Sequence, residues 1–214
     1  MKKLKTDEVI QKVAGDLFRK FGFEKTSMDD IARKAHKAKR SIYNHFNNKE
    51  DIFSAGVRQE VENIRARLLE AMANEQELVL PRLRRYLLLR MELFADAGML
   101  QVAMKNNMLS ADDHRFEDLK SIHDGFATWE HGLFKKVWYA KPTTDTLEVV
   151  EQQAVAFADM LHVTLNGLTH SFFVDGKYEQ YKSSYEMLID LIVNSVFQTF
   201  TSQLLQTQSV VNEK

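Results

Sequence analysis

The side chains best suited to chemistry in this sequence lie between Thr26 and Phe53. Ala38, Ile42 and Phe46 recur at a helical spacing and are predicted to form one inward face, so the residues between them point outward. This outward face carries two cations, an aromatic ring and an amide, from Lys39, Arg40, Tyr43 and Asn44. Cations attract phosphates and an amide pairs with a base edge, so the pattern predicts a helix that enters the major groove of DNA.

A short helix is predicted immediately before this one. Ser27 and Asp30 have the spacing of a capping box, in which the hydroxyl accepts a backbone N–H and the carboxylate reaches back over the first turn. The helix is expected to run from about Met28 to Ala35, with a narrow apolar stripe that requires neighbouring helices. Two short helices joined by a tight turn predict a helix-turn-helix.

A longer helix is predicted to follow, capped by Asn47 or Asn48. Lys49 lies in its first turn beside N-terminal amides that would favour an anion. Upstream, an apolar stripe from Ile10 to Phe21 predicts a first helix, which Gly22 ends in a left-handed conformation. The preceding lysines are either an arm on DNA or a frayed terminus; they are Lys2, Lys3 and Lys5.

Residues of about 8 to 55 resemble the N-terminal domain of the TetR family of bacterial transcriptional regulators. The resemblance includes Phe21-Gly22-Phe23, Thr26 to Ala32, Ile42 to Phe46 and Lys49 to Phe53. His36, Lys37 and Ala38 depart from the Gly-Val-Ser common in the family. We expect His36 to make the turn at a cost of about 1 kcal/mol if its backbone is left-handed, and Ala38 to lack a side-chain cap.

The outward residues divide by chemistry into two predicted groups. Lysine and arginine suit guanine and asparagine suits adenine, so base-edge contacts are assigned to Lys37, Arg40, Ser41 and Asn44. Phosphate contacts are assigned to Ser27, Lys39, Tyr43, His45 and Lys49. An inverted-repeat operator in double-stranded DNA is the expected partner.

The charge distribution agrees with DNA binding at one end of the chain. Residues 1–50 contain 13 Lys and Arg against 7 Asp and Glu, whereas the remainder contains 16 against 23. The N-terminal part is therefore basic and the rest acidic, although basic termini are often simply solvated. The absence of cysteine excludes disulfides and thiolate zinc sites and fits a cytoplasmic protein, and no apolar run is long enough to predict a membrane span.

The remaining residues are predicted to be helical throughout, which gives an all-α fold. The predicted division is a helix-turn-helix DNA-binding domain at 1–48 and a helical effector-binding and dimerisation domain at 49–214. A central helix is expected over 80–96, a short one over 99–108, and a long one that Ser110 and Asp113 cap. Pro142 is expected in a connection before the last two helices, at about 145–174 and 178–206.

The last helix is apolar on two sides, so one side needs a partner. The resemblance implies a homodimer through the last two helices, although a fully internal helix is the alternative. It also implies an unknown small-molecule effector, best an apolar or aromatic one. Candidate contacts, each also a candidate for the core, are Tyr86, Arg90, Phe94, Met104, Met108, Phe126, Trp129, Glu130, His162 and Asn166.

Catalytic and metal-binding patterns are weak. The histidines after residue 49 stand eight or nine apart within their helices, and the pair Asp159 and His162 lacks the glutamates of a di-iron bundle. No phosphate loop, GxGxxG or GxSxG occurs, so no catalytic residue, metal or cofactor is assigned. The sequence predicts a DNA-binding transcriptional regulator, most simply a repressor released by an effector. The alternatives are a non-specific DNA-packaging protein and an all-helical enzyme with an apolar pocket.

Overall fold

The structure, a computed structural model, describes residues 6–74, 76–109, 114–139 and 146–212, and side chains at 197 and 199–212 are outside the description. Three sequence expectations fall outside the described residues: the N-terminal lysine arm, the Ser110–Asp113 cap and the connection at Pro142.

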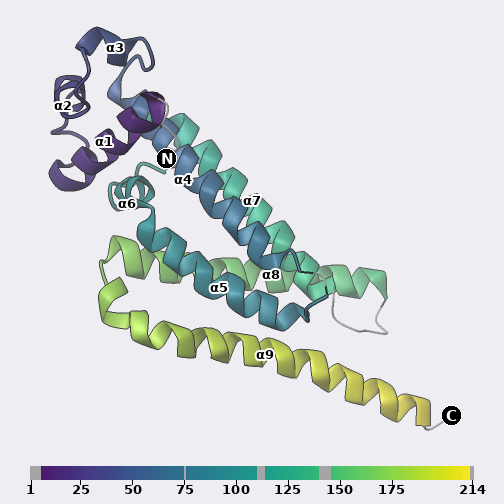
Figure 1. Ribbon diagram of the computed structural model, residues 1–214. Helices are drawn as coiled ribbons and strands as arrows, with labels where there is room; N and C mark the ends of the chain where they lie inside the picture. The colour runs from purple at the N-terminus through teal and green to yellow at the C-terminus, as the bar shows by residue number, and fades with distance from the viewer. Residues whose placement is uncertain (1–5, 75, 110–113, 140–145, 213–214) are drawn as a thin grey trace. The chain divides into compact units, whose positions relative to one another are not determined.

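Every regular element within the described ranges is helical, which confirms the all-α prediction (Figure 1). The elements are α1 (Thr6–Phe21), α2 (Met28–Lys34), α3 (Lys39–Tyr43), α4 (Lys49–Met72), α5 (Val79–Asp96), α6 (Gly98–Lys105), η1 (His114–Phe116), α7 (Glu117–Tyr139), α8 (Leu147–Thr169), η2 (His170–Val174) and α9 (Tyr178–Asn212).

The chain divides into two compact units, and neither is continuous in sequence. The first unit consists of Met1–Arg65 and Leu93–Gly125, and the second of Ala66–Glu92 and Phe126–Lys214. Helices α4, α5 and α7 each contribute residues to both units. The first unit is thus larger than the predicted domain at 1–48.

An aromatic cluster explains why the first unit extends beyond residue 48. Phe18 and Phe23 pack against Phe53 of α4, with ring centroids 5.4 and 5.1 Å away. Phe116 of η1 packs on Phe23 at 5.3 Å and is fully buried. Buried aromatic pairs of this kind stabilise the fold through area and edge-to-face geometry. Phe53 and Phe116, which are 63 positions apart in the chain (116 minus 53), therefore share one core with α1.

Helix α6 is attached to the same core by a carboxylate. Its N-cap, Ala97, has no side-chain hydrogen bond. Glu60 of α4 supplies the missing acceptors, because its two oxygens accept from the amides of Met99 at 3.1 Å and Leu100 at 2.8 Å. Burial raises the pKa of Glu60, while these backbone donors act in the opposite direction.

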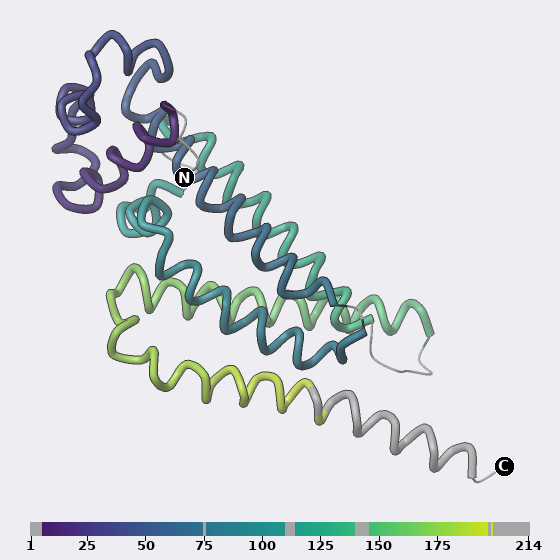
Figure 2. The backbone as a smooth tube through the Cα atoms, in the orientation of Figure 1, coloured from purple at the N-terminus to yellow at the C-terminus, as the bar shows by residue number. Residues whose placement is uncertain are grey.

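Helix α5 lies at the centre of the second unit, as its apolar sequence predicts. Leu83, Tyr86, Leu87 and Met91 are each at most 1 % exposed. The phenol of Tyr185 on α9 donates to the carbonyl of Leu87 at 2.8 Å. Figure 2 traces the chain from α8 through residues 170–177 into α9, which returns beside α8. The turn consists of the π-helical η2 and Gly176, whose positive φ of 72° glycine adopts without strain.

Candidate nucleic-acid interface

The predicted capping box begins α2. Ser27 Oγ accepts from the amide of Asp30 at 3.2 Å, and the Asp30 carboxylate accepts from the amide of Ser27 at 3.1 Å. The Ser27 hydroxyl also donates to Asp30 at 2.6 Å. These hydrogen bonds, with the charge of Arg33, hold the pKa of Asp30 below its usual value. The start of α2 is therefore fixed by local side chains, and the prediction is confirmed.

The turn between α2 and α3 is made by His36, which has the left-handed conformation expected of it, with φ of 53°. The amide of His36 donates to the carbonyl of Arg33 at 3.3 Å, and that of Lys37 donates to Ala32 at 3.0 Å. These bonds satisfy carbonyls at the end of α2. Gly22 ends α1 in the same way with φ of 86°, as predicted.

Helix α3 separates an inward from an outward face, but the predicted inward face holds only in part, because Phe46 is half-buried and Ala38 is exposed at the N-cap. Ile42 is fully buried, whereas Lys37, Arg40, Tyr43 and Asn44 are exposed. Ser41 is half-buried, and the N-cap Ala38 makes no side-chain hydrogen bond. The predicted base-reading residues thus lie on or beside one accessible helix face.

The cations near α3 differ in their partners. Lys39 Nζ forms an ion pair with Asp29 at 2.8 Å, which raises the pKa of Lys39. His45 Nδ1 lies 2.5 Å from a carboxylate oxygen of Asp7 on α1. Lys37 and Arg40 have neither an ion pair nor a side-chain hydrogen bond within the described part of the chain. These two cations are free to meet an external anion or base.

Lys49 has an internal partner that the sequence did not indicate. Its Nζ donates to the carbonyl of Phe23 at 3.0 Å and lies 4.4 Å from the centre of the Phe23 ring. Its side chain is 20 % exposed. Lys49 therefore links the start of α4 to the loop after α1.

The N-cap of α4 is Asn48, whose side chain accepts from the amide of Asp51 at 2.7 Å.

Among the predicted effector contacts, the structure brings Tyr86, Arg90 and Glu130 together in the second unit. Arg90 Nε and Tyr86 Oη each lie 2.6 Å from Glu130 Oε1, and Arg90 Nη1 donates to Thr169 at 2.9 Å. Arg90 is 2 % and Glu130 0 % exposed. Burial alone would raise the pKa of Glu130, but the Arg90 charge and the hydrogen bonds of the cluster lower it to about 2. The pair is a satisfied buried ion pair.

The other predicted effector contacts are distributed over both units. His162 Nδ1 lies 3.7 Å from Glu130, and His162 Nε2 is hydrogen-bonded to Asn166 at 2.8 Å. The rings of Phe126 and Trp129 lie 5.3 Å apart on α7. The remaining three belong to the first unit and are Phe94, Met104 and Met108.

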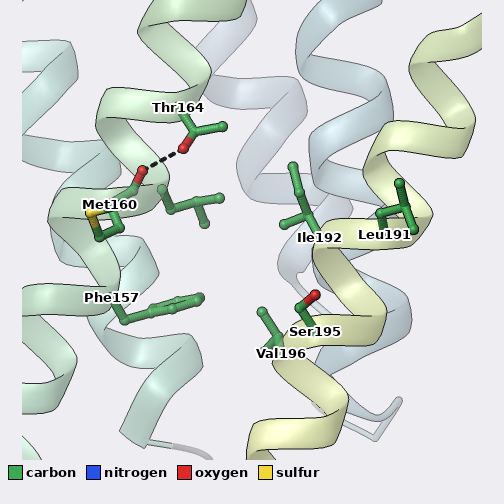
Figure 3. Close-up of a pocket in the computed structure, with 8 residues that line it drawn as sticks. Phe157, Met160, Thr164, Leu191, Ile192, Ser195 and Val196 are labelled. Carbon is green, nitrogen blue, oxygen red and sulfur yellow. Dashed lines mark hydrogen bonds between the residues drawn. The ribbon is translucent and has the colours of Figure 1, made fainter.

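An apolar groove of about 300 Å³ runs between α8 and α9 (Figure 3). Phe157 and Met160 line it from α8, and Leu191 and Ile192 from α9. Met160 is 66 % and Leu191 59 % exposed. Apolar side chains this exposed on two neighbouring helices indicate a face that needs a cover.

The acid–histidine pair noted in the sequence does not form a common site. Asp159 bonds His131 Nε2 at 2.9 Å, while His162 faces Glu130. No group of three or more His, Cys, Asp or Glu side chains suited to a metal occurs within the described ranges. Across the same residues, no helix combines the length and apolarity that crossing a membrane requires.

Comparisons with known proteins match a family model over part of the chain and a fold over most of it. Residues 10–55 match the family model for bacterial regulatory proteins of the tetR family. A transcriptional regulator from Rhodococcus sp. Rha1 superposes with a TM-score of 0.68 at 17 % identity, covering 91 % of this chain and 97 % of that one. A comparison with curated proteins finds no significant match.

Two further solved structures share the fold. One is the SmeT–triclosan complex, with a TM-score of 0.67, 17 % identity, and coverage of 89 % of this chain and 90 % of that one. The other is a TerR/AcrR-family transcriptional regulator from Aquifex aeolicus VF5, with a TM-score of 0.66, 16 % identity, and coverage of 88 % of this chain and 99 % of that one. The family match covers the helices that present the basic outward face, and the fold agrees over most of the chain. Residues 10–55 are therefore similar to the tetR family of bacterial regulatory proteins, and most of the chain has the fold of the solved structures above.

Proposed function

We propose that the protein is a homodimeric, sequence-specific repressor that leaves its operator when a small molecule binds its helical C-terminal part. The observation that carries the proposal is the exposed face of α3, where Lys37 and Arg40 have no charged partner among the described residues. A cation that is already exposed and unpaired loses little on meeting DNA. We assign the DNA-binding function to residues 1–48 and dimerisation and effector binding to 49–214.

In this proposal the base edges are read by Lys37, Arg40, Ser41 and Asn44. Arginine and lysine donate to guanine O6 and N7, and asparagine pairs with adenine. Phosphates are held by Ser27, Lys39, Tyr43, His45 and Lys49. For Lys39, His45 and Lys49 this requires exchange of an internal partner for a phosphate, so they contribute less net affinity than Arg40. The internal partner is a carboxylate for Lys39 and His45 and the Phe23 carbonyl for Lys49.

The proposed dimer uses the exposed apolar face of α8 and α9. Two DNA-binding domains are needed because half-sites about 34–36 Å apart are read by a twofold-symmetric pair. A second copy of the same face would bury Met160 and Leu191, which are otherwise costly to expose. Its symmetry also matches an inverted-repeat operator.

The proposed effector role is supported by analogy with SmeT, which was solved as a complex with triclosan. A ligand that prefers a spacing of the two DNA-binding domains other than the one that fits the operator would shift the dimer away from the DNA-bound arrangement. Repression follows if the operator overlaps a promoter.

A binding titration tests the proposal. Purified protein is titrated on DNA from upstream of its own gene and on random DNA, across a salt series. We expect a preference of about 10³-fold or more and protection of an inverted repeat. Equal, strongly salt-dependent binding to all upstream and genomic fragments would instead indicate non-specific DNA packaging and overturn the proposal.

A further inference from the structure

A second groove, separate from the α8–α9 face, lies in the second unit. It has a volume of about 720 Å³. Its walls are formed by the end of α4, the start of α5 and the end of α7, and the side chains that matter are Leu69, Met72, Val79, Arg82, Leu133 and Lys136. The volume lies in the range of about 300–1,000 Å³ typical of small-molecule sites. Four of these six side chains are apolar.

Arg82 is the unusual member of this groove. Its Nη1 donates to the carbonyl of Met72 at 3.1 Å, whereas its Nε is buried and has no acceptor among the described residues. A buried donor without a partner carries an uncompensated desolvation cost. An acceptor that reached the Nε edge after a small rotation of the side chain would recover that cost.

The other arginines of α5 show that this deficit is particular to Arg82. Arg84 is bonded to Asp190 and Glu186, at 2.7 and 2.6 Å. Arg85 is bonded to Glu77 at 2.8 Å, and Arg90 to Glu130. Each of these three guanidinium groups therefore has a carboxylate. The charge of Arg82 contributes to lowering the pKa of Glu77, but the two side chains are not hydrogen-bonded, because that carboxylate is already paired with Arg85.

The charge of the groove is positive. Lys136 has no ion pair within the described part of the chain, and Glu70 is the single carboxylate in the wall. Guanidinium groups bind carboxylates with two parallel hydrogen bonds, and an ammonium adds a point charge. The apolar walls suit a hydrocarbon body attached to such an acid.

We propose that this groove binds a small amphipathic organic anion, with its acid group on Arg82 and Lys136 and its apolar body against Leu69, Met72, Val79 and Leu133. Its identification as the effector site rests on the proposed function, whereas binding itself does not. The ligand class also differs from the purely apolar or aromatic compound that the sequence suggests.

Sodium decanoate and 1-decanol are suitable probes because they differ only in the charged head. Each is titrated into the intact dimer, without DNA, against the fluorescence of bound 1-anilinonaphthalene-8-sulfonate. We expect decanoate to displace the dye at a concentration about tenfold lower than decanol. Arg82→Gln should weaken decanoate about tenfold and leave decanol nearly unchanged.

Two matched variants make the result specific to the groove. Ala73→Trp places an indole at an exposed position of the wall and should abolish binding of both probes. Arg67→Gln removes an equivalent charge from an exposed position of α4 outside the groove and should change decanoate binding less than twofold. The melting temperature of each variant verifies folding.

The site is overturned if decanoate and decanol bind equally, or if decanoate binding survives Arg82→Gln and Ala73→Trp unchanged. Operator affinity is measured separately, with and without saturating decanoate. Arg82-dependent binding without any loss of operator affinity would support the site and overturn its effector role. Failure to bind any operator would overturn the proposed function while leaving the decanoate result intact.

Discussion

Arg40 is the side chain whose role is most sharply defined by its surroundings. It is exposed on α3 and has no charged partner in the described part of the molecule. We predict that Arg40→Ala relaxes base preference at one operator position by about 1–3 kcal/mol. Binding to a set of operators with single base changes would measure this.

Lys39 provides the matched control on the same helix. Because it is assigned to a phosphate, Lys39→Ala should weaken binding to all sequences alike. Its pairing with Asp29 should keep the decrease in salt slope below the value of about one expected for an unpaired lysine. A loss of equal size on operator and random DNA for Arg40→Ala would remove Arg40 from the base-reading group.

Glu130 makes a pH-dependent contribution to stability. The pKa of its carboxyl falls from 4.5 to about 2 in the fold, so the folded state binds this proton less tightly than the unfolded state. The stabilisation is therefore fully present above about pH 4.5 and is lost as the pH falls towards 2. We predict that the free energy of unfolding, measured in urea, decreases across this interval.

Removal of both partners isolates that contribution. Glu130→Gln alone leaves Arg90 buried without its counter-charge, at a cost of about 3–5 kcal/mol. The double change Arg90→Met with Glu130→Gln should cost less at pH 7 and show a shallower decrease in acid. An unchanged acid slope in the double variant would mean that other carboxylates control it.

At the scale of the element, the turn between α2 and α3 contains a non-glycine residue in the left-handed region. His36 adopts φ of 53°, a region in which glycine avoids the steric penalty of Cβ. His36→Gly should therefore raise the free energy of unfolding by up to about 1 kcal/mol. The urea midpoint should rise at constant slope. Alanine at the same position, which keeps Cβ, serves as the control, and a gain of similar size in that variant would contradict the explanation.

Elements governed by neighbouring residues were predictable from the sequence. The capping box at Ser27, the end of α1 at Gly22 and the outward face of α3 all depend on residues within four or five positions. In such cases spacing alone determines which groups meet.

Contacts between distant residues were not predictable in this way. Glu60 caps a helix that begins 38 residues later, and Lys49 bonds a carbonyl 26 residues earlier. Arg90 meets Glu130 across 40 residues. Arg90 and Glu130 were both predicted as possible ligand contacts. A sequence shows that a side chain is charged, but only the fold shows that it is buried in an ion pair.

At the scale of the whole molecule, the proposed function requires two copies of the chain. We predict that Leu191→Asp, which places a charge in the apolar groove between α8 and α9, converts the dimer to a monomer. Light scattering after size exclusion would measure the mass. Operator affinity should fall by more than tenfold, because each DNA-binding domain would then bind its half-site alone.

Leu78→Asp is the control for this experiment, because Leu78 is 79 % exposed and does not line the groove. It should remain dimeric. If Leu191→Asp also remained a dimer with full operator affinity, the α8–α9 face would not be the interface.

The discontinuous first unit limits how this protein can exchange parts with proteins of similar fold. Recombination that replaced residues 1–48 would import α1 to α3 but leave behind Phe53 and Phe116, whose rings complete their core. A chimaera made at that boundary would therefore combine two half-cores selected separately. New DNA specificity is more accessible to this protein by point changes on the exposed face of α3 than by the transfer of a module.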